Sequence, residues 1–293
     1  MSNGAHPRTD APRTRAVTKL AVVAVIVVAV LFAMVALIAI ALNGGGAHSG
    51  TPASGLAGGT PPHTPGPQTS GSGAPHSTES GDGAWDVSAE DAIARSPMVA
   101  FSVEATQPHA LSTRTAGSAI ALPTATVRTG VVAQGFPQTP QGALAQLKAL
   151  DETGMRGLDP AAYDLAWQEL ALPGAPTSTT VGLVRAASAA RRAGSLDATG
   201  PVDGLTSTYQ VDAGLIKGTA DNGNFVVACV LGELSAITPT AARRAGVGDC
   251  QGMRWVEGRW RISPTALPSA ASCAWPGTEE AVTAGYRAVI SGA

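Results

Sequence analysis

The chain has 293 residues, of which 44% are hydrophobic, with 19 basic and 21 acidic side chains and three cysteines. This length predicts one or two small domains with irregular sequence beside them. The near-neutral charge excludes a strongly basic nucleic-acid-binding domain, and the cysteines lack the spacing of a structural zinc site.

Residues 20–42 form an apolar run of 23 residues without a charge, glycine or proline. This is long enough to cross a hydrocarbon core of about 30 Å as a helix, so we predict one transmembrane helix. The alternative is a cleaved signal peptide, because residues 39–41 have the form of a cleavage site. The basic tail 1–19, and the absence of Lys or Arg after the helix until Arg95, predict a single-pass protein of the cell membrane with a cytoplasmic N-terminus.

Residues 43–84 consist mainly of Gly, Ser, Thr, Pro and Ala. Such a segment buries too little apolar surface to offset the entropy of ordering, so we predict a disordered linker that tethers the extracellular part. Its histidines, His48, His63 and His76, lie far apart in the sequence. A flexible chain does not preorganise them, and we expect no metal site there.

Two segments that flank the predicted domain have little periodicity. We predict that residues 85–134 form an irregular lead-in to the domain, with a short helix at 86–95 and a short strand at 98–103. Residues 266–293 predict a C-terminal extension. The domain itself is therefore assigned to residues 135–265.

Helical patterns begin this domain. A capping residue followed by proline, a typical helix start, occurs at Thr139 and again at Asp159. The first predicted helix ends at Gly154 and the second stops at Pro173. A third helix, rich in small residues, is predicted at 179–193.

After the third helix the pattern becomes that of strands. An Asn-Gly pair at 222–223 is a strong hairpin signal between predicted strands at 205–219 and 225–231. A second hairpin is predicted at 253–262 with its loop at 257–258. Helices followed by antiparallel strands predict an α+β domain with three helices packed on a curved antiparallel sheet.

Three tryptophans are candidates for the core. Trp255 and Trp260 lie opposite each other on one face of the second predicted hairpin. Trp167 lies four residues after Tyr163 and three before Leu170, a helical spacing that places all three on one apolar face. We expect all three tryptophans to be buried rather than to form a ligand platform.

The other face of this hairpin carries Arg254, Arg259 and Arg261. Arg254 and Arg261 are predicted to lie directly opposite each other, an arrangement tolerated where solvent or an acidic group covers the charges. These three arginines are therefore a candidate face for an acidic partner. The alternative is an ordinary solvated surface.

Cys229 and Cys250 are predicted to form a disulfide. Cys229 lies in the predicted strand 225–231, and the chain after it can return antiparallel with Cys250 beside it. An extracytoplasmic location allows oxidation. The alternatives are a Cys250–Cys273 pair and a buried, unpaired Cys229, whereas our preferred pairing leaves Cys273 free.

Three segments resemble the nuclear-transport-factor-2-like cone fold of exported proteins from high-GC Gram-positive bacteria. They read GFPQTPQGALAQL at 135–147, FVVACVL at 225–231 and VEGRWRI at 256–262. The order of tail, membrane helix, linker and cone domain is similar to that of assembly-factor subunits of type IV secretion and conjugation systems. This resemblance implies a scaffold that contacts other envelope proteins or a second copy of itself.

Catalytic patterns are scarce in the predicted domain. Every histidine lies at or before His109, which excludes Ser-His-Asp and Cys-His catalysis within it. The resemblance implies that an enzyme would use Asp and Tyr, and Tyr163, Asp164, Tyr209 and Asp212 are available. Nucleotide-binding glycine patterns are missing too. We expect a non-enzymatic scaffold without a cofactor; the alternative is a small-ligand binder or an isomerase- or dehydratase-like enzyme.

Overall fold

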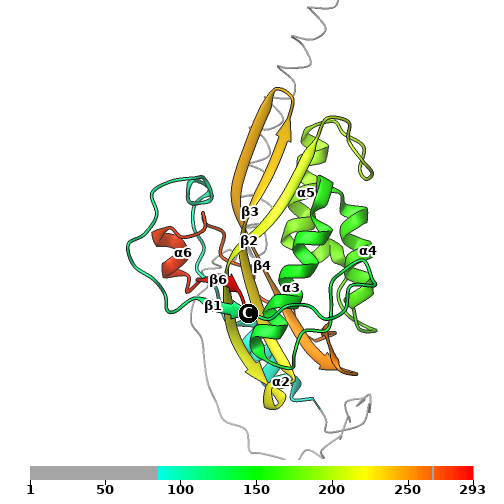
Figure 1. Cartoon of the computed structure of the whole chain (residues 1–293), viewed down its shortest axis with the longest axis vertical. Coiled ribbons are helices and arrows are strands. Elements are labelled where there is room, and N and C mark those ends of the chain that lie inside the picture. Colours follow the sequence, from blue (N-terminus) through cyan, green and yellow to red (C-terminus); the bar gives the residue numbers. More distant parts are fainter. Residues whose placement is uncertain (1–84, 266, 293) are drawn as a thin grey trace, which may run out of the picture.

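The structure is a computed structural model that describes residues 85–265 and 267–292 (Figure 1). The predicted tail, membrane helix and linker, at 1–19, 20–42 and 43–84, lie outside these residues. Within the described ranges, no helix is long and apolar enough to cross a membrane.

Six strands of the described residues form one curved sheet in the order β1-β6-β2-β3-β4-β5 (Figure 1). The strands are β1 (Ile120–Leu122), β2 (Thr206–Ala220), β3 (Phe225–Thr238), β4 (Ala241–Val256), β5 (Arg259–Ile262) and β6 (Arg287–Ser291). β2 to β5 form an antiparallel meander, whereas β1 pairs with β6 in parallel. The fold is α+β, as predicted, but its sheet is mixed at one edge.

Capping residues determine where two of the longer helices begin. The helices are α2 (Val87–Arg95), α3 (Pro140–Gly154), α4 (Pro160–Leu170), α5 (Gly182–Ala193) and α6 (Glu279–Thr283), with 3-10 turns η1 (Val103–Thr106), η2 (Arg156–Leu158), η3 (Ser178–Thr180) and η4 (Asp221–Gly223). Thr139 accepts the Gly142 N–H, and Asp159 accepts the Ala161 N–H, each at 3.0 Å. The predicted strand at 98–103 is not formed; this segment is irregular and leads into η1.

Strand β3 is apolar along its first half because both faces of the sheet are covered. Val226, Ala228 and Val230 pack with α3, α4 and α5 in the main core. Cys229 and Leu231 point to the opposite face, where they meet residues of the C-terminal segment. Burial on both sides explains why this run lacks the alternation of a half-exposed strand.

The second face of the sheet is covered by segments outside 135–265. Helix α2 packs against β2 and β3, and the chain before α6 crosses β4. At that crossing Gly246 is required, because a Cβ there would overlap the Ala274 carbonyl. The flanking segments 85–134 and 266–293 thus contribute α2, β1, α6 and β6 to the same fold.

The hairpin between β4 and β5 has the predicted register. Glu257 and Gly258 form its loop, both with positive φ, which suits the tight turn of a twisted hairpin. Trp255 pairs with Trp260 across the strands, as the sequence predicted.

Candidate functional site

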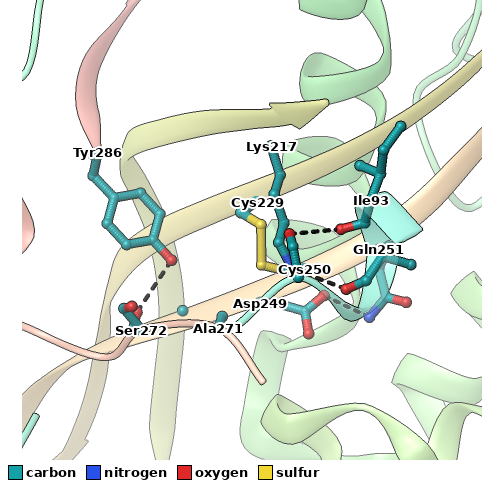
Figure 2. Close-up of a disulfide and its surroundings, with 12 residues drawn as sticks. Ile93, Lys217, Cys229, Asp249, Cys250, Gln251, Ala271, Ser272 and Tyr286 are labelled. Carbon is teal, nitrogen blue, oxygen red and sulfur yellow. Dashed lines mark hydrogen bonds between the residues drawn. A yellow bond between two sulfur atoms is a disulfide. The ribbon is translucent and has the colours of Figure 1, made fainter. Parts of the chain in front are cut away.

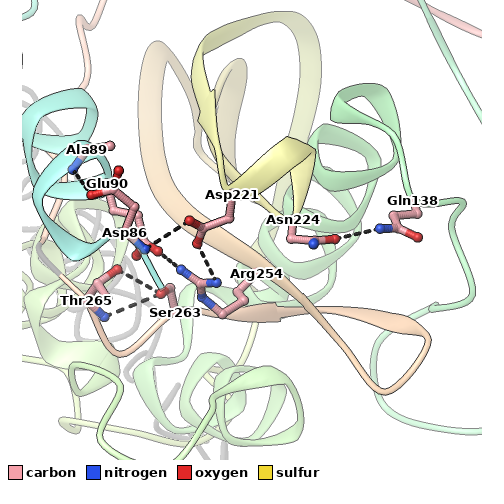
Figure 3. Close-up of polar contacts among 9 residues, drawn as sticks. All are labelled: Asp86, Ala89, Glu90, Gln138, Asp221, Asn224, Arg254, Ser263 and Thr265. Atoms are coloured by element: carbon pink, nitrogen blue, oxygen red, sulfur yellow. Dashed lines mark hydrogen bonds and ion pairs between the residues drawn. The ribbon is translucent and has the colours of Figure 1, made fainter. Parts of the chain in front are cut away.

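Arg254, the first arginine of the predicted partner face, is buried inside the domain with 2% of its side chain exposed. It forms ion pairs with Glu90 of α2 and, at 2.9 Å, with Asp221 of η4 (Figure 3). Its guanidinium carbon lies 3.9 Å from the centre of the Trp85 ring. Burial lowers the pKa of Arg254 to about 10. The acidic groups come from this chain, so Arg254 is not part of an exposed partner face.

The other two arginines have different surroundings. Arg261 donates hydrogen bonds to the carbonyls of Leu170 and Ala171, at 3.0 and 3.2 Å, where α4 ends. Burial lowers the pKa of Arg261. Arg259 is 43% exposed and lies 3.7 Å from Glu257. Of the three predicted arginines, Arg259 alone therefore presents much of its charge to solvent.

The predicted core tryptophans differ in burial. Trp260 is 1% exposed, and its indole N–H donates to the Pro137 carbonyl at 2.8 Å. Trp167 is 2% exposed and donates to the Pro176 carbonyl at 2.9 Å. Trp255 is half-buried and stands edge-on to Trp260, with ring centres 5.3 Å apart. Two of the rings are core residues, and the third lies at the core's margin.

Cys229 and Cys250 form the predicted disulfide (Figure 2). They lie directly opposite each other in the β3–β4 ladder, the adjacency on which the prediction depended. Cys273 is free, and its sulfur accepts the Gly248 N–H at 3.3 Å. Burial raises the pKa of Cys273 to about 11, which keeps this thiol protonated and weakly nucleophilic.

Two carboxyl groups lie inside the domain, between the helices and the sheet. Asp151 of α3 accepts the Tyr163 hydroxyl at 2.6 Å, and its Oδ2 has no hydrogen-bond partner among the described residues. Asp249 of β4 accepts the Gln251 side-chain amide at 2.8 Å (Figure 2). Burial raises the pKa of Asp249 to about 6 and that of Asp151 well above its usual value. We call Asp151, Tyr163 and Asp249 the acid cluster.

The acid cluster has the chemistry of a proton-transfer site, since such sites combine buried ionisable groups with raised pKa values. Tyr209, a sequence candidate, lies in the same core and donates to the Val247 carbonyl at 2.7 Å. Asp164, another candidate, lies elsewhere and accepts the Ser178 hydroxyl at 2.6 Å. Members of the cluster are at most 4% exposed, so a substrate reaches them only if the packing opens.

Sequence reasoning missed both carboxylates of the acid cluster. Asp151 lies four residues after Leu147, and this spacing places it on the buried face of its helix. Asp249 lies two residues from Val247 and two from Gln251, and side chains two apart in a strand point to the same face. All three therefore lie on the helix side of β4. Spacing relative to apolar neighbours was the signal that could have found both.

A cleft of about 480 Å³ opens where β2 and β6 separate. These strands pair at two positions, Ala213 with Ala288 and Gly214 with Arg287, and then diverge around the cleft. Its walls are formed by α3, the segment 123–136, the first half of β2 and the C-terminal end of β6. They include Leu122, Arg128, Phe136, Ala145, Lys148, Ala149, Glu152, Gln210, Val211, Asp212, Val289, Ile290 and Ser291. We call it the β2–β6 cleft.

Charges in the β2–β6 cleft are balanced within it. Lys148 forms an ion pair with Glu152, whose Oε1 also accepts the Val211 N–H at 2.9 Å. Asp212 is the extra residue of a β-bulge and lines the cleft, where it accepts the Gln210 amide at 2.9 Å. Partial burial raises the pKa of Asp212. Tyr209 points into the core, so Asp212 and Tyr209 do not share a pocket.

The described residues contain no group of three or more His, Cys, Asp or Glu side chains placed to hold a metal ion. No protein family, curated protein or solved structure matches this chain. The candidate sites for function are therefore the acid cluster and the β2–β6 cleft, judged on their own geometry.

Proposed function

We propose that this chain is a membrane-tethered interaction subunit whose described domain lies outside the cytoplasm. The observation that carries the proposal is the disulfide between Cys229 and Cys250. Such bonds persist in oxidising compartments and are rare in the cytosol. The apolar run 20–42 and the basic tail 1–19 indicate the same side of the membrane for the domain. Two independent features thus support one location.

The resemblance to nuclear-transport-factor-2-like cone domains supports a finer proposal, an assembly subunit of a conjugation or type IV secretion apparatus. Helices α3 to α5 followed by the antiparallel strands β2 to β5 are compatible with a cone of this kind. The partners would be other envelope proteins or a second copy of the chain. Nucleic acid is a poor candidate, because residues 85–293 carry more acidic than basic side chains.

A second candidate function is a small-ligand binder or an enzyme of the isomerase or dehydratase type. The acid cluster favours it, because Asp249 has a pKa of about 6 and lies in the core that holds the Tyr163 hydroxyl. We prefer the interaction subunit because these groups are at most 4% exposed.

Thiol labelling of intact cells tests the proposed location. In a full-length chain with Cys273→Ser, Ser77→Cys should react with a membrane-impermeant maleimide in intact cells. The matched Ser2→Cys variant should react only after the cells are opened. Labelling in the reverse order, or recovery of the chain from the soluble fraction, would contradict a tethered extracytoplasmic domain.

Crosslinking in the membrane separates the two candidate functions. Purification of the crosslinked full-length chain should recover subunits of a transfer or export apparatus, or a dimer of the chain. Recovery of the uncrosslinked monomer, together with turnover of a small substrate that Asp249→Asn abolishes, would favour the enzyme instead.

A further inference from the structure

We propose that the β2–β6 cleft binds an extended peptide segment of a partner protein as an added strand. This inference rests on the proposed interaction function and names the chemistry of the partner. It follows from the main-chain groups, the charges and the α3 wall of the cleft.

The two strands that flank the cleft, β2 and β6, direct main-chain groups toward it beyond the two positions at which they pair. The Gly292 N–H donates to the Leu122 carbonyl at 2.7 Å, so this residue directs its main-chain groups to the edge of β6 that faces β1. Because successive residues of a strand direct their main-chain groups to alternate edges, those of Val289 and Ser291 are directed to the edge that faces β2. Across the cleft, the Val211 N–H points outward from β2. The two edges thus offer donors and acceptors to a strand placed between them.

A side chain takes the place of a strand acceptor at Val211. Its N–H is bound by Glu152 of α3 at 2.9 Å, and Lys148 pairs with the same carboxylate. When a peptide carbonyl replaces Glu152 at this N–H, Lys148 keeps the carboxylate neutralised. The exchange therefore leaves the partly buried Glu152 carboxylate with its cation.

The shape and charge of the cleft define the segment that fits. Strands β2 and β6 each line the cleft with three residues, 210–212 and 289–291, so the inserted stretch is about three residues or about 10 Å long. Ala145 and Ala149 of the α3 wall leave room for one large apolar side chain. Arg128 and Lys148 are matched by Glu152 and Asp212, which favours a segment without net charge.

An extended peptide fits these features better than a small metabolite. Strand addition obtains its affinity from main-chain hydrogen bonds to open edges, and its specificity from pockets for alternate side chains. The β2–β6 cleft has both, and its volume of about 480 Å³ accommodates a few residues.

The test is titration of the full-length, isotope-labelled chain with acetyl-Thr-Val-Thr-Val-Thr-amide, followed by amide NMR. We expect saturable shifts centred on Val211, Val289 and Ser291 at millimolar peptide. The same peptide methylated at alternate main-chain nitrogens should bind at least tenfold more weakly. Absence of shifts, shifts elsewhere, or equal binding of the methylated peptide would overturn the proposal.

A cleft-filling variant gives an independent check. Ala149→Tyr should weaken peptide binding at least tenfold, whereas Ala161→Tyr, on the exposed start of α4, should leave it unchanged. Equal binding to both variants would overturn the proposal. These titrations use no cellular partner, so their failure is distinguishable from failure of the labelling and crosslinking tests of the proposed function.

Discussion

Trp255 and Trp260 are a matched pair of rings that differ in burial, and their truncation tests how the terminal hairpin is packed. Trp260 is 1% exposed and its N–H binds the Pro137 carbonyl. Trp260→Ala should therefore lower the free energy of unfolding by about 3–5 kcal/mol, the usual loss for a buried aromatic side chain. Trp255 is half-buried. Trp255→Ala should cost roughly 1–2 kcal/mol, since less apolar area leaves water on folding.

Urea unfolding of the full-length variants, followed by circular dichroism, measures the difference. Each substitution removes the same atoms and abolishes the same edge-to-face ring contact, so the difference in cost reports on burial and on the Trp260 hydrogen bond. A loss below about 1 kcal/mol for Trp260→Ala would show that this ring is exposed in solution and available as a binding surface. A larger loss for Trp255→Ala than for Trp260→Ala would refute the packing described above.

Three further predictions concern the disulfide and the buried charges. Reduction should lower stability by about 3 kcal/mol in the chain-entropy model, because the bridge joins residues 21 apart, and calorimetry should show a lower Tm. Arg254→Met should cost about 3–5 kcal/mol because it leaves buried Glu90 without its cation, whereas Arg259→Met should leave the urea midpoint nearly unchanged; equal shifts would contradict this. Asp249 binds its proton more tightly in the folded state, with a pKa of about 6 against 3.8, so the stability it contributes at low pH is lost as pH rises through this window. The stability of Asp249→Asn relative to wild type should increase from about pH 4 to 6, and parallel urea-midpoint curves would disagree.

Elements specified by neighbouring residues were predictable from the sequence. The caps at Thr139 and Asp159 determine helix starts through bonds to amides two or three residues later. The loop at 257–258 sets the register that places Trp255 opposite Trp260. The disulfide was predictable for a related reason, because a single chain reversal is enough to bring Cys229 and Cys250 together.

Features that depend on distant segments were not predictable. The counter-ions of Arg254 come from α2 and η4, and no local period links Glu90 to a hairpin near the other end of the chain. Strands β1 and β6 are short, and they add to the sheet because the C-terminal segment returns beside β2. The β2–β6 cleft depends on that return and on the bulge at Asp212. Candidate sites of this kind become visible only when the tertiary pairing is known.

The most direct test of an extracytoplasmic, membrane-held domain is disulfide mapping of the full-length chain from cells whose thiols are blocked before lysis. Chain recovered from the membrane fraction should contain a peptide pair joined through Cys229 and Cys250, with Cys273 alkylated after denaturation. The same chain should retain residues 20–42. Alkylation of both Cys229 and Cys250 in the blocked cells would contradict an extracytoplasmic location of the domain.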